Sequence, residues 1–434
     1  MKKLFSLFFC FSLLTHAQSQ SSKTEINADS AKNVSFIKYY TKKIIEHPKD
    51  TNAYYKRGEA KLNLNDFAGS ITDFNKALVL DAKYEFAYLD RGRAKYALKD
   101  YPGSIKDYAQ TIALNPKSSA AFYDRGLAEE KLKDYNAAIS DFNVAVGLDP
   151  NDGDFYNERG ICKKRLEDYK AAIEDFTKAL TIDPKDHKPY YNRGLCKNLL
   201  EEYSNAIEDF NTAISLKPDD EDAYYQRGNS KRALKDLKGA IDDYDKAITI
   251  DPKFIDCYNN RGLAKFYAQD YKAAIDDYGK GISIDSKYAP AYYNRGMAND
   301  KLNNYNEALD DYVQYIKLEP NDPDGYYKRA DVKYNLEDYK NALIDFDKTI
   351  SLDAKYTDAY VDRGLTKRKL TDYKGAIDDY TKAIELDPKY ANAYNNRGYA
   401  KHLLSDDAGA CVDFKKALEL GSEYAAGNIS NYCK

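Results

Sequence analysis

The sequence contains no tryptophan, only four histidines and only 12 prolines in 434 residues. Histidines so few and so scattered give no metal cluster and no nucleophile–base pair that spacing could support. Proline and glycine are too scarce for a collagen-like or disordered chain, and 42 tyrosines supply enough apolar area to order the backbone. We therefore expect a packed, non-catalytic protein that needs no metal and no cofactor.

Long apolar segments are also scarce. One run, from Leu4 to Leu14, follows Lys2 and Lys3 and precedes Ala17. This order is typical of a secretory signal peptide over residues 1–17, and the run is too short to span a membrane. The sequence predicts an exported protein of a bacterial periplasm, cell surface or medium that is not integral to the membrane. Loss of two lysines makes the net charge of −4 more negative, so nucleic acid is not an expected partner.

Internal repetition decides the fold class. Arginine recurs every 34 residues from Arg57 to Arg397, eleven times without insertion or deletion, and glycine follows every one except Arg329. Within each repeat, apolar and small residues recur at helical spacing in two stretches, which predicts two amphipathic helices. Asp66 precedes the second helix as an N-cap, and its equivalents are Asp except for Glu202 and Asn304.

This pattern resembles the tetratricopeptide repeat family, whose 34-residue unit carries an aromatic, a glycine, a small residue, an aromatic, an alanine and a proline at set places. Here those residues are, for example, Tyr190, Gly194, Ala206, Phe210, Ala213 and Pro218. The resemblance implies an all-α, right-handed α-solenoid (superhelix) of stacked helix-turn-helix units over residues 51–424. Residues 18–50 are then a polar segment and a capping helix, and residues 425–434 a C-terminal capping helix.

Each recurring arginine shares its repeat with an equally regular aspartate. Eleven carboxylates and eleven guanidiniums could hold a ligand, but a function seldom needs eleven identical copies, whereas locking helices together does. We interpret them as an internal salt-bridge ladder, exemplified by Arg57 with Asp73, Arg193 with Asp209, and Arg295 with Asp311.

Cysteine gives one further hypothesis, because an exported protein meets an oxidising compartment. Cys411 replaces the buried isoleucine of the last full second helix, and Cys433 lies on the capping helix expected to pack against it. They could be bridged, or they could be two buried thiols. Cys162 and Cys196 occupy equivalent places in adjacent repeats, about a helix diameter apart, which is too far for a disulfide.

Function is expected where the repeats differ. One stripe on the first helix, at i, i+4 and i+7, varies between repeats, and the resemblance places such residues on the concave face. The candidate groove residues are Tyr55, Tyr123, Tyr191, Tyr225, Arg232, Tyr293, Met297, Tyr327, Tyr334 and Arg368. Some stripe residues, especially leucines such as Leu195, could instead pack against the next first helix.

A groove rich in tyrosine with scattered arginine is typical of protein-binding surfaces. The sequence therefore favours a scaffold in the bacterial cell envelope that binds a protein or peptide partner through this groove. The alternative is a glycan-binding envelope protein, because tyrosine can stack on sugar rings, although sugar sites usually add tryptophan. The lysine–asparagine set with which some tetratricopeptide grooves clamp a terminal carboxylate is missing here.

Overall fold

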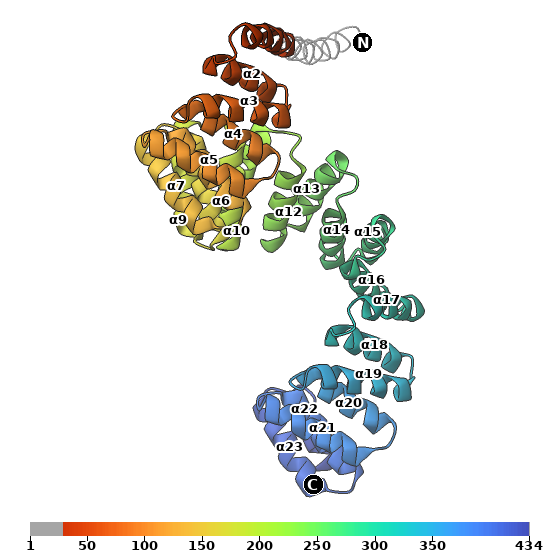
Figure 1. Cartoon of the computed structure of the whole chain (residues 1–434). Coiled ribbons are helices and arrows are strands. Elements are labelled where there is room, and N and C mark those ends of the chain that lie inside the picture. Colours follow the sequence, from red (N-terminus) through yellow and green to blue (C-terminus); the bar gives the residue numbers. More distant parts are fainter. Residues whose placement is uncertain (1–28, 434) are drawn as a thin grey trace, which may run out of the picture. The chain divides into compact units, whose positions relative to one another are not determined.

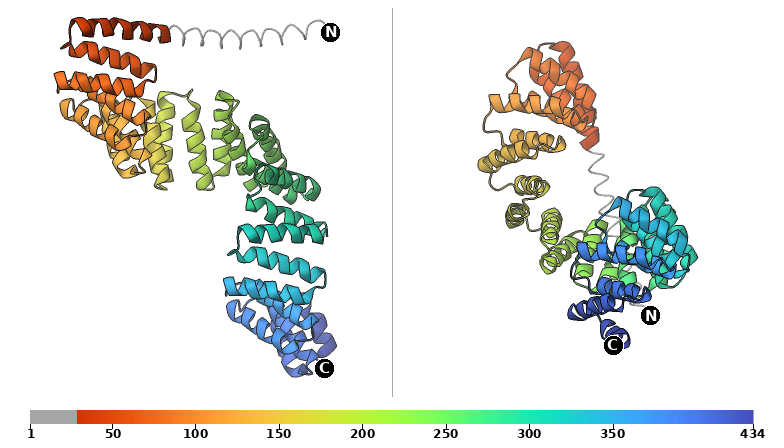
Figure 2. Two further views of the ribbon diagram at one scale, coloured as in Figure 1. Left: turned by 45° about the vertical axis from the view of Figure 1, so that its right-hand side comes forward. Right: turned by 90° about the horizontal axis from the view of Figure 1, so that it is seen from below.

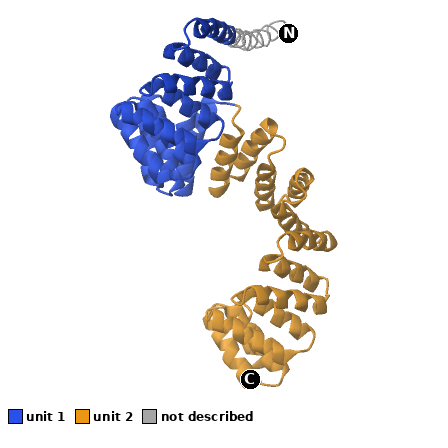
Figure 3. Cartoon of the chain, viewed as in Figure 1, with its two compact units in different colours: residues 1–218 blue, residues 219–434 orange. Residues whose placement is uncertain are grey.

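The structure is a computed structural model that describes residues 29–433, and over that range it holds helices and turns but no strand. The chain divides into unit 1, which ends at Pro218, and unit 2, which begins at Asp219 (Figure 3). The predicted signal peptide, residues 1–17, lies outside the described residues. None of the described helices is long and apolar enough to cross a membrane.

Unit 1 consists of an N-terminal helix, helical over residues 29–46, followed by five helix pairs in chain order (Figure 1). The pairs are α2 (Thr51–Asn63) with α3 (Phe67–Leu80), α4 (Glu85–Ala97) with α5 (Tyr101–Leu114), α6 (Ser119–Lys131) with α7 (Tyr135–Leu148), α8 (Gly153–Arg165) with α9 (Tyr169–Ile182), and α10 (His187–Leu199) with α11 (Tyr203–Leu216).

Unit 2 consists of six helix pairs and a short final helix. They are α12 (Glu221–Ala233) with α13 (Leu237–Ile250), α14 (Ile255–Tyr267) with α15 (Tyr271–Ile284), α16 (Ala289–Lys301) with α17 (Tyr305–Leu318), α18 (Pro323–Asn335) with α19 (Tyr339–Leu352), α20 (Thr357–Lys369) with α21 (Tyr373–Leu386), α22 (Ala391–Leu403) with α23 (Asp407–Glu419), and α24 (Ala425–Tyr432). The predicted all-α solenoid of stacked helix pairs is confirmed.

Each pair is joined by the same tight turn. The second residue after the first helix adopts a left-handed conformation in all eleven repeats, with φ between 59° and 65°, although none of these residues is glycine. The next residue caps the second helix: the side chain of Asp66 accepts a hydrogen bond from the backbone N–H of Gly69 at 2.9 Å. Glu202 and Asn304, the two departures in this column, form no such side-chain bond. The same backbone turn therefore joins the two helices of every pair.

Close approach of the two helices explains the recurring glycine. A Cβ atom added to Gly194 would lie 2.8 Å from the ring of Phe210 on the second helix. That ring is fully buried, as are the alanines that flank it, Ala206 and Ala213. A methyl group at Gly194 would require the Phe210 ring or the helices to shift, so close packing favours glycine here, although repeat 9 accommodates Ala330 at the equivalent position.

Contacts between the helices define which of them form the inner layer of each unit. In each unit every first helix contacts the next first helix, as α2 contacts α4 and α12 contacts α14. The described second helices do not contact one another, so within a unit they are spread further apart than the first helices. These contacts place the first helices on the inner side of the curve in each unit. Figure 2 shows the helices of each unit stacked one after another in chain order.

Candidate partner-binding face

The arginine–aspartate ladder is built from a two-point contact within each helix pair. In repeat 4, Arg159 donates through Nε and Nη2 to the two oxygens of Asp175 at 2.9 and 2.6 Å. The carboxylate is buried, and Lys163 adds an ammonium at 2.8 Å. One aspartate thus holds two cations of the first helix.

The same arginine also reaches backwards along the array. Arg159 donates through Nη1 to Asn143 on the preceding second helix at 2.8 Å, and its guanidinium lies 5.3 Å from the Tyr156 ring. Arg57 makes the matching bond to Thr41 of the N-terminal helix, which thereby occupies the place of a preceding second helix. Arg193 with Asp209 and Arg295 with Asp311 have the same two-point geometry. In these three repeats the charges of the ladder are paired within the array, as expected for a structural role.

Tyrosines of the groove stripe are packed more deeply than their sequence variability indicates. Each ring lies against the buried aromatic ring of its own second helix, with centroids 5.8 to 6.0 Å apart. The rings concerned belong to Tyr55, Tyr123, Tyr191, Tyr225, Tyr293 and Tyr327. Tyr55 is 7% exposed, so its assignment to an open groove is wrong, because Tyr84 and Phe86 of neighbouring segments cover it. The other five are half-buried.

Several of these hydroxyls make bonds to the following repeat. Tyr55 donates to Asp90 at 2.9 Å, and Tyr327 donates to Asp362 at 2.7 Å. Burial raises the pKa of both phenols far above the ordinary value, with the neighbouring carboxylate as the second cause. Burial also raises the pKa of Tyr293 to about 12. These hydroxyls therefore remain neutral hydrogen-bonding groups at physiological pH.

Two arginines of the stripe carry charge that no carboxylate balances among the described residues. Arg232 and Arg368 occupy equivalent positions in α12 and α20, and each has a buried Nε without a hydrogen-bond partner. The guanidinium of Arg368 lies 5.1 Å from the ring of Tyr399 on the next first helix. Met297 and Tyr334 are half-buried on α16 and α18 between these two positions. All four residues remain part of the first-helix face, which we define as the stripe and the column one residue after its tyrosines.

That second column is the part of the site that sequence reasoning missed. It carries Asp90, Asp124 and Glu158 in unit 1, and burial raises the pKa of all three carboxyls. Arg93 of the stripe bridges two of them, with contacts of 3.3 Å to Asp90 and 2.7 Å to Asp124. The spacing in the sequence could have indicated this contact. Arg93 and Asp124 are 31 residues apart and lie on adjacent first helices.

The same 31-residue step relates three acidic residues in unit 2. Asp300, Asp331 and Asp362 lie on α16, α18 and α20, and burial is the first cause of the raised pKa of each. Repulsion from Asp331 contributes to the rise at Asp362, whose pKa reaches about 6. The described residues contain no group of three or more acidic, histidine or cysteine side chains placed to hold a metal ion. This row is therefore a negative strip and not a chelating site.

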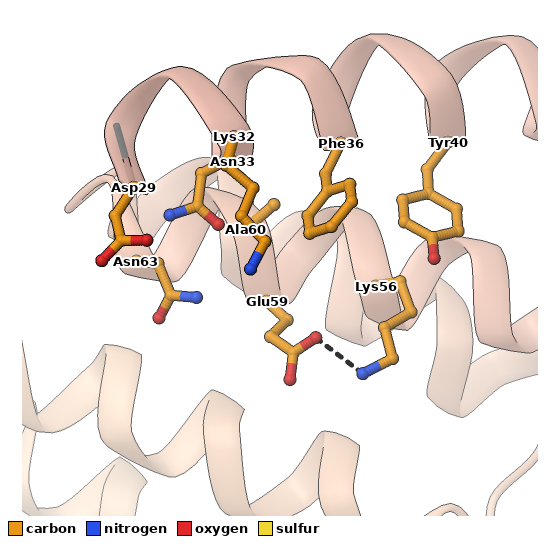
Figure 4. Close-up of a pocket in the computed structure, with 9 residues that line it drawn as sticks. All are labelled: Asp29, Lys32, Asn33, Phe36, Tyr40, Lys56, Glu59, Ala60 and Asn63. Atoms are coloured by element: carbon orange, nitrogen blue, oxygen red, sulfur yellow. Dashed lines mark hydrogen bonds and ion pairs between the residues drawn. The ribbon is translucent and has the colours of Figure 1, made fainter. Parts of the chain in front are cut away.

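A cavity of about 580 Å³ lies at the N-terminal end of the first-helix face of unit 1 (Figure 4). Phe36 and Tyr40 of the N-terminal helix project over it, and Lys56 and Glu59 of α2 pair at 2.8 Å along its wall. The lining combines aromatic edges, charges and amides without a nucleophile beside a base. It can contact a ligand but offers no chemistry.

The C-terminal cap is held covalently. Cys411 of α23 and Cys433, which follows α24, form a disulfide with an S–S distance of 2.01 Å. The rings of His402 and Tyr432 lie 4.1 Å apart, and Asn428 donates to Asn395 at 2.8 Å. Cys162 and Cys196 are unbridged and buried, and burial raises the pKa of their thiols to about 12 and about 11. These two thiols therefore act as small core residues.

Four family models match the chain, and two of them match it in phase with these helix pairs. One model described as tetratricopeptide repeat matches residues 153–186, 187–220, 221–254 and 289–322, and another with that description matches 51–84, 255–288 and 323–356. A third so described matches residues 89–153, and a model described as TPR repeat matches 364–405. Together the matches span well over half of the chain.

Several solved structures are similar to the chain. The APC/C hetero-tetramer Cut9-Hcn1 is 15% identical, with 94% of this chain and 95% of that one covered and a TM-score of 0.46. The C-terminal part of a TPR repeat-containing protein from Cytophaga hutchinsonii is 22% identical over 55% and 98% of the chains, with a TM-score of 0.48. YrrB, described as a TPR protein with an unusual peptide-binding site, is 20% identical over 45% and 97%, with a TM-score of 0.38. A comparison with curated proteins found no match.

Proposed function

Because the chain belongs to the tetratricopeptide repeat family, we propose that it is a protein-interaction scaffold that binds a segment of a partner along its first-helix face. The observation that carries the proposal is the contrast between two sets of side chains. The ladder, the turn aspartates and the packing glycines repeat from pair to pair. The half-exposed residues of the first-helix face differ in size, charge and polarity, as a surface that recognises one sequence must.

The character of this face suits a protein partner. The face combines half-buried tyrosines with Arg232, Met297 and Arg368. Tyrosine and arginine dominate binding energy at protein interfaces, and methionine is enriched there. The negative strip of Asp300, Asp331 and Asp362 favours a partner segment with a basic side chain at that level. We further propose that the protein acts in the envelope or outside the cell, in keeping with the signal-like segment at residues 1–17.

The packing of the tyrosines decides how the proposal should be tested. Removing a ring such as that of Tyr293 would open a cavity against the second-helix aromatic and lower the folding stability by roughly 3 kcal/mol. A loss of binding could then not be distinguished from a loss of folding. A better variant exchanges two charges on the face, Lys328→Glu with Asp331→Lys, and keeps the net charge. The matched control exchanges Lys280→Glu with Asp276→Lys, which are exposed on α15.

Affinity capture from envelope extract should recover a protein with the wild type and the control, and lose it with the face variant. Circular dichroism should show equal helix content in all three proteins. Equal capture by the face variant would exclude this surface, and recovery of polysaccharide without protein would replace the proposal with the glycan-binding alternative.

A further inference from the structure

Repeat 3 breaks the ladder in one place. In nine of the eleven repeats a lysine four residues after the ladder arginine donates to the ladder aspartate at 2.7 to 2.8 Å. In repeat 8 Asn299 fills the position and donates to Asp311 at 3.3 Å. In repeat 3 the position holds Glu129, so a carboxyl group stands where every other repeat has a donor.

The surroundings of Glu129 supply no substitute cation. Its own helix α6 contributes Arg125, which is already bonded to both oxygens of Asp141 on α7 at 2.6 and 2.7 Å. Asp134, the N-cap of α7, adds a second negative charge on that side. On the other side α5 places Ala109 where α7 carries Asn143, so Arg125 has no partner there. Glu129 forms no ion pair with any described residue, and its Oε2 is buried without a hydrogen-bond partner.

Electrostatics then restrict the ionisation of this pair. Two carboxylates beside one guanidinium repel each other in a partly buried site, and one of them is stabilised by holding a proton. Burial, followed by the charge of Asp141, raises the pKa of Glu129 to about 7, while Arg125 opposes the rise.

We propose that Arg125, Glu129 and Asp141 form a pH-sensitive contact between α6 and α7, which we call the joint. The joint is closed when the two helices pack as in the structure and open when they separate locally. When protonated, Glu129 donates its O–H to the Asp141 carboxylate and replaces the missing lysine as a donor. When ionised, Glu129 repels Asp141 and weakens the contact that holds the two helices together. This device is independent of the proposed function, since neither carboxyl belongs to the first-helix face.

Linkage gives the sign and size of the effect. The folded-state pKa of Glu129 lies above the ordinary value of 4.5, so the closed joint binds more protons than the open one, and its stability falls as pH rises from about 4.5 to about 7. With these two values, opening of the joint should increase about tenfold between pH 6 and pH 8.

Hydrogen exchange on the full chain at pH 6 and pH 8, corrected for the intrinsic pH dependence of exchange, tests the proposal. Amides of α6 and α7 should open about tenfold more at pH 8, whereas those of α8 and α9, where Lys163 completes the ladder, should not change. Glu129→Gln, which cannot ionise, should abolish the pH dependence in α6 and α7.

Two further variants exchange the residue types at this position between repeats 3 and 4. Lys163→Glu should confer the same pH dependence on α8 and α9, and Glu129→Lys should remove it from repeat 3 by restoring the lysine. The proposal is overturned if the wild type shows no change in α6 and α7 between the two pH values, or if Glu129→Gln retains the wild-type response.

Discussion

Replacing Cys433 with serine should release the C-terminal cap. The disulfide closes a loop of 22 residues, for which the chain-entropy model gives a stabilisation of about 3 kcal/mol. The cap depends on such attachment, because α24 has only eight residues and helices so short are unstable alone in water. Its ring contact to His402 and the bond from Asn428 to Asn395 are weak by comparison.

A loss of this size corresponds to an increase on the order of 100-fold in the opening of α24. Hydrogen exchange of the α24 amides should show it in Cys433→Ser and in the wild type under reductant. Cys196→Ala is the matched control, because Cys196 is an unbridged thiol and equivalent positions such as Ala264 carry alanine. Unchanged protection of α24 without the disulfide would refute the reasoning and assign the stability of the cap to packing.

Three further substitutions test the packing of the array. Asp175→Ala should destabilise repeat 4 by about 3 kcal/mol, because Arg159 and Lys163 lose their shared carboxylate. The loss should appear as faster hydrogen exchange in α8 and α9. An effect under about 1 kcal/mol would mean that the ladder behaves as an exposed surface pair. Gly194→Ala should destabilise its helix pair by about 1 to 3 kcal/mol in urea unfolding, because the new Cβ would lie 2.8 Å from the Phe210 ring. Wild-type stability of this variant would contradict the close-approach explanation. Tyr278→Phe should leave stability unchanged or raise it by up to about 1 kcal/mol in the same assay, because the buried hydroxyl has no partner, and a clear loss would reveal a bond absent from this structure.

The sequence was a sufficient guide wherever an interaction lies inside one repeat. The helix pair, the turn aspartate, and the arginine and aspartate 16 residues apart follow from a helical period and a fixed turn. The bond between Arg159 and Asn143 also spans 16 residues but joins neighbouring repeats, so its existence depends on how the pairs stack. The same holds for Tyr55 with Asp90, which turned an expected groove residue into a core residue.

Variability along the chain was an incomplete guide to exposure. A tyrosine column that alternates with asparagine and leucine resembles a free surface, yet each ring lies on a second-helix aromatic. The acidic column next to it escaped notice because its members are charged, and charges on a helix are usually solvated. The division of the chain after Pro218 had no sequence signal, since the 34-residue period continues through it.

Among helices α2 to α24, none contacts a helix of its own unit that lies more than two helices away along the chain. The described part of each unit therefore has no contact between distant helices that would fix its length, so the length is an adjustable quantity. Deleting one 34-residue segment inside a unit rejoins surfaces that already match, and removes one row of side chains from the first-helix face. The length of the first-helix face within a unit can therefore change by whole 34-residue repeats.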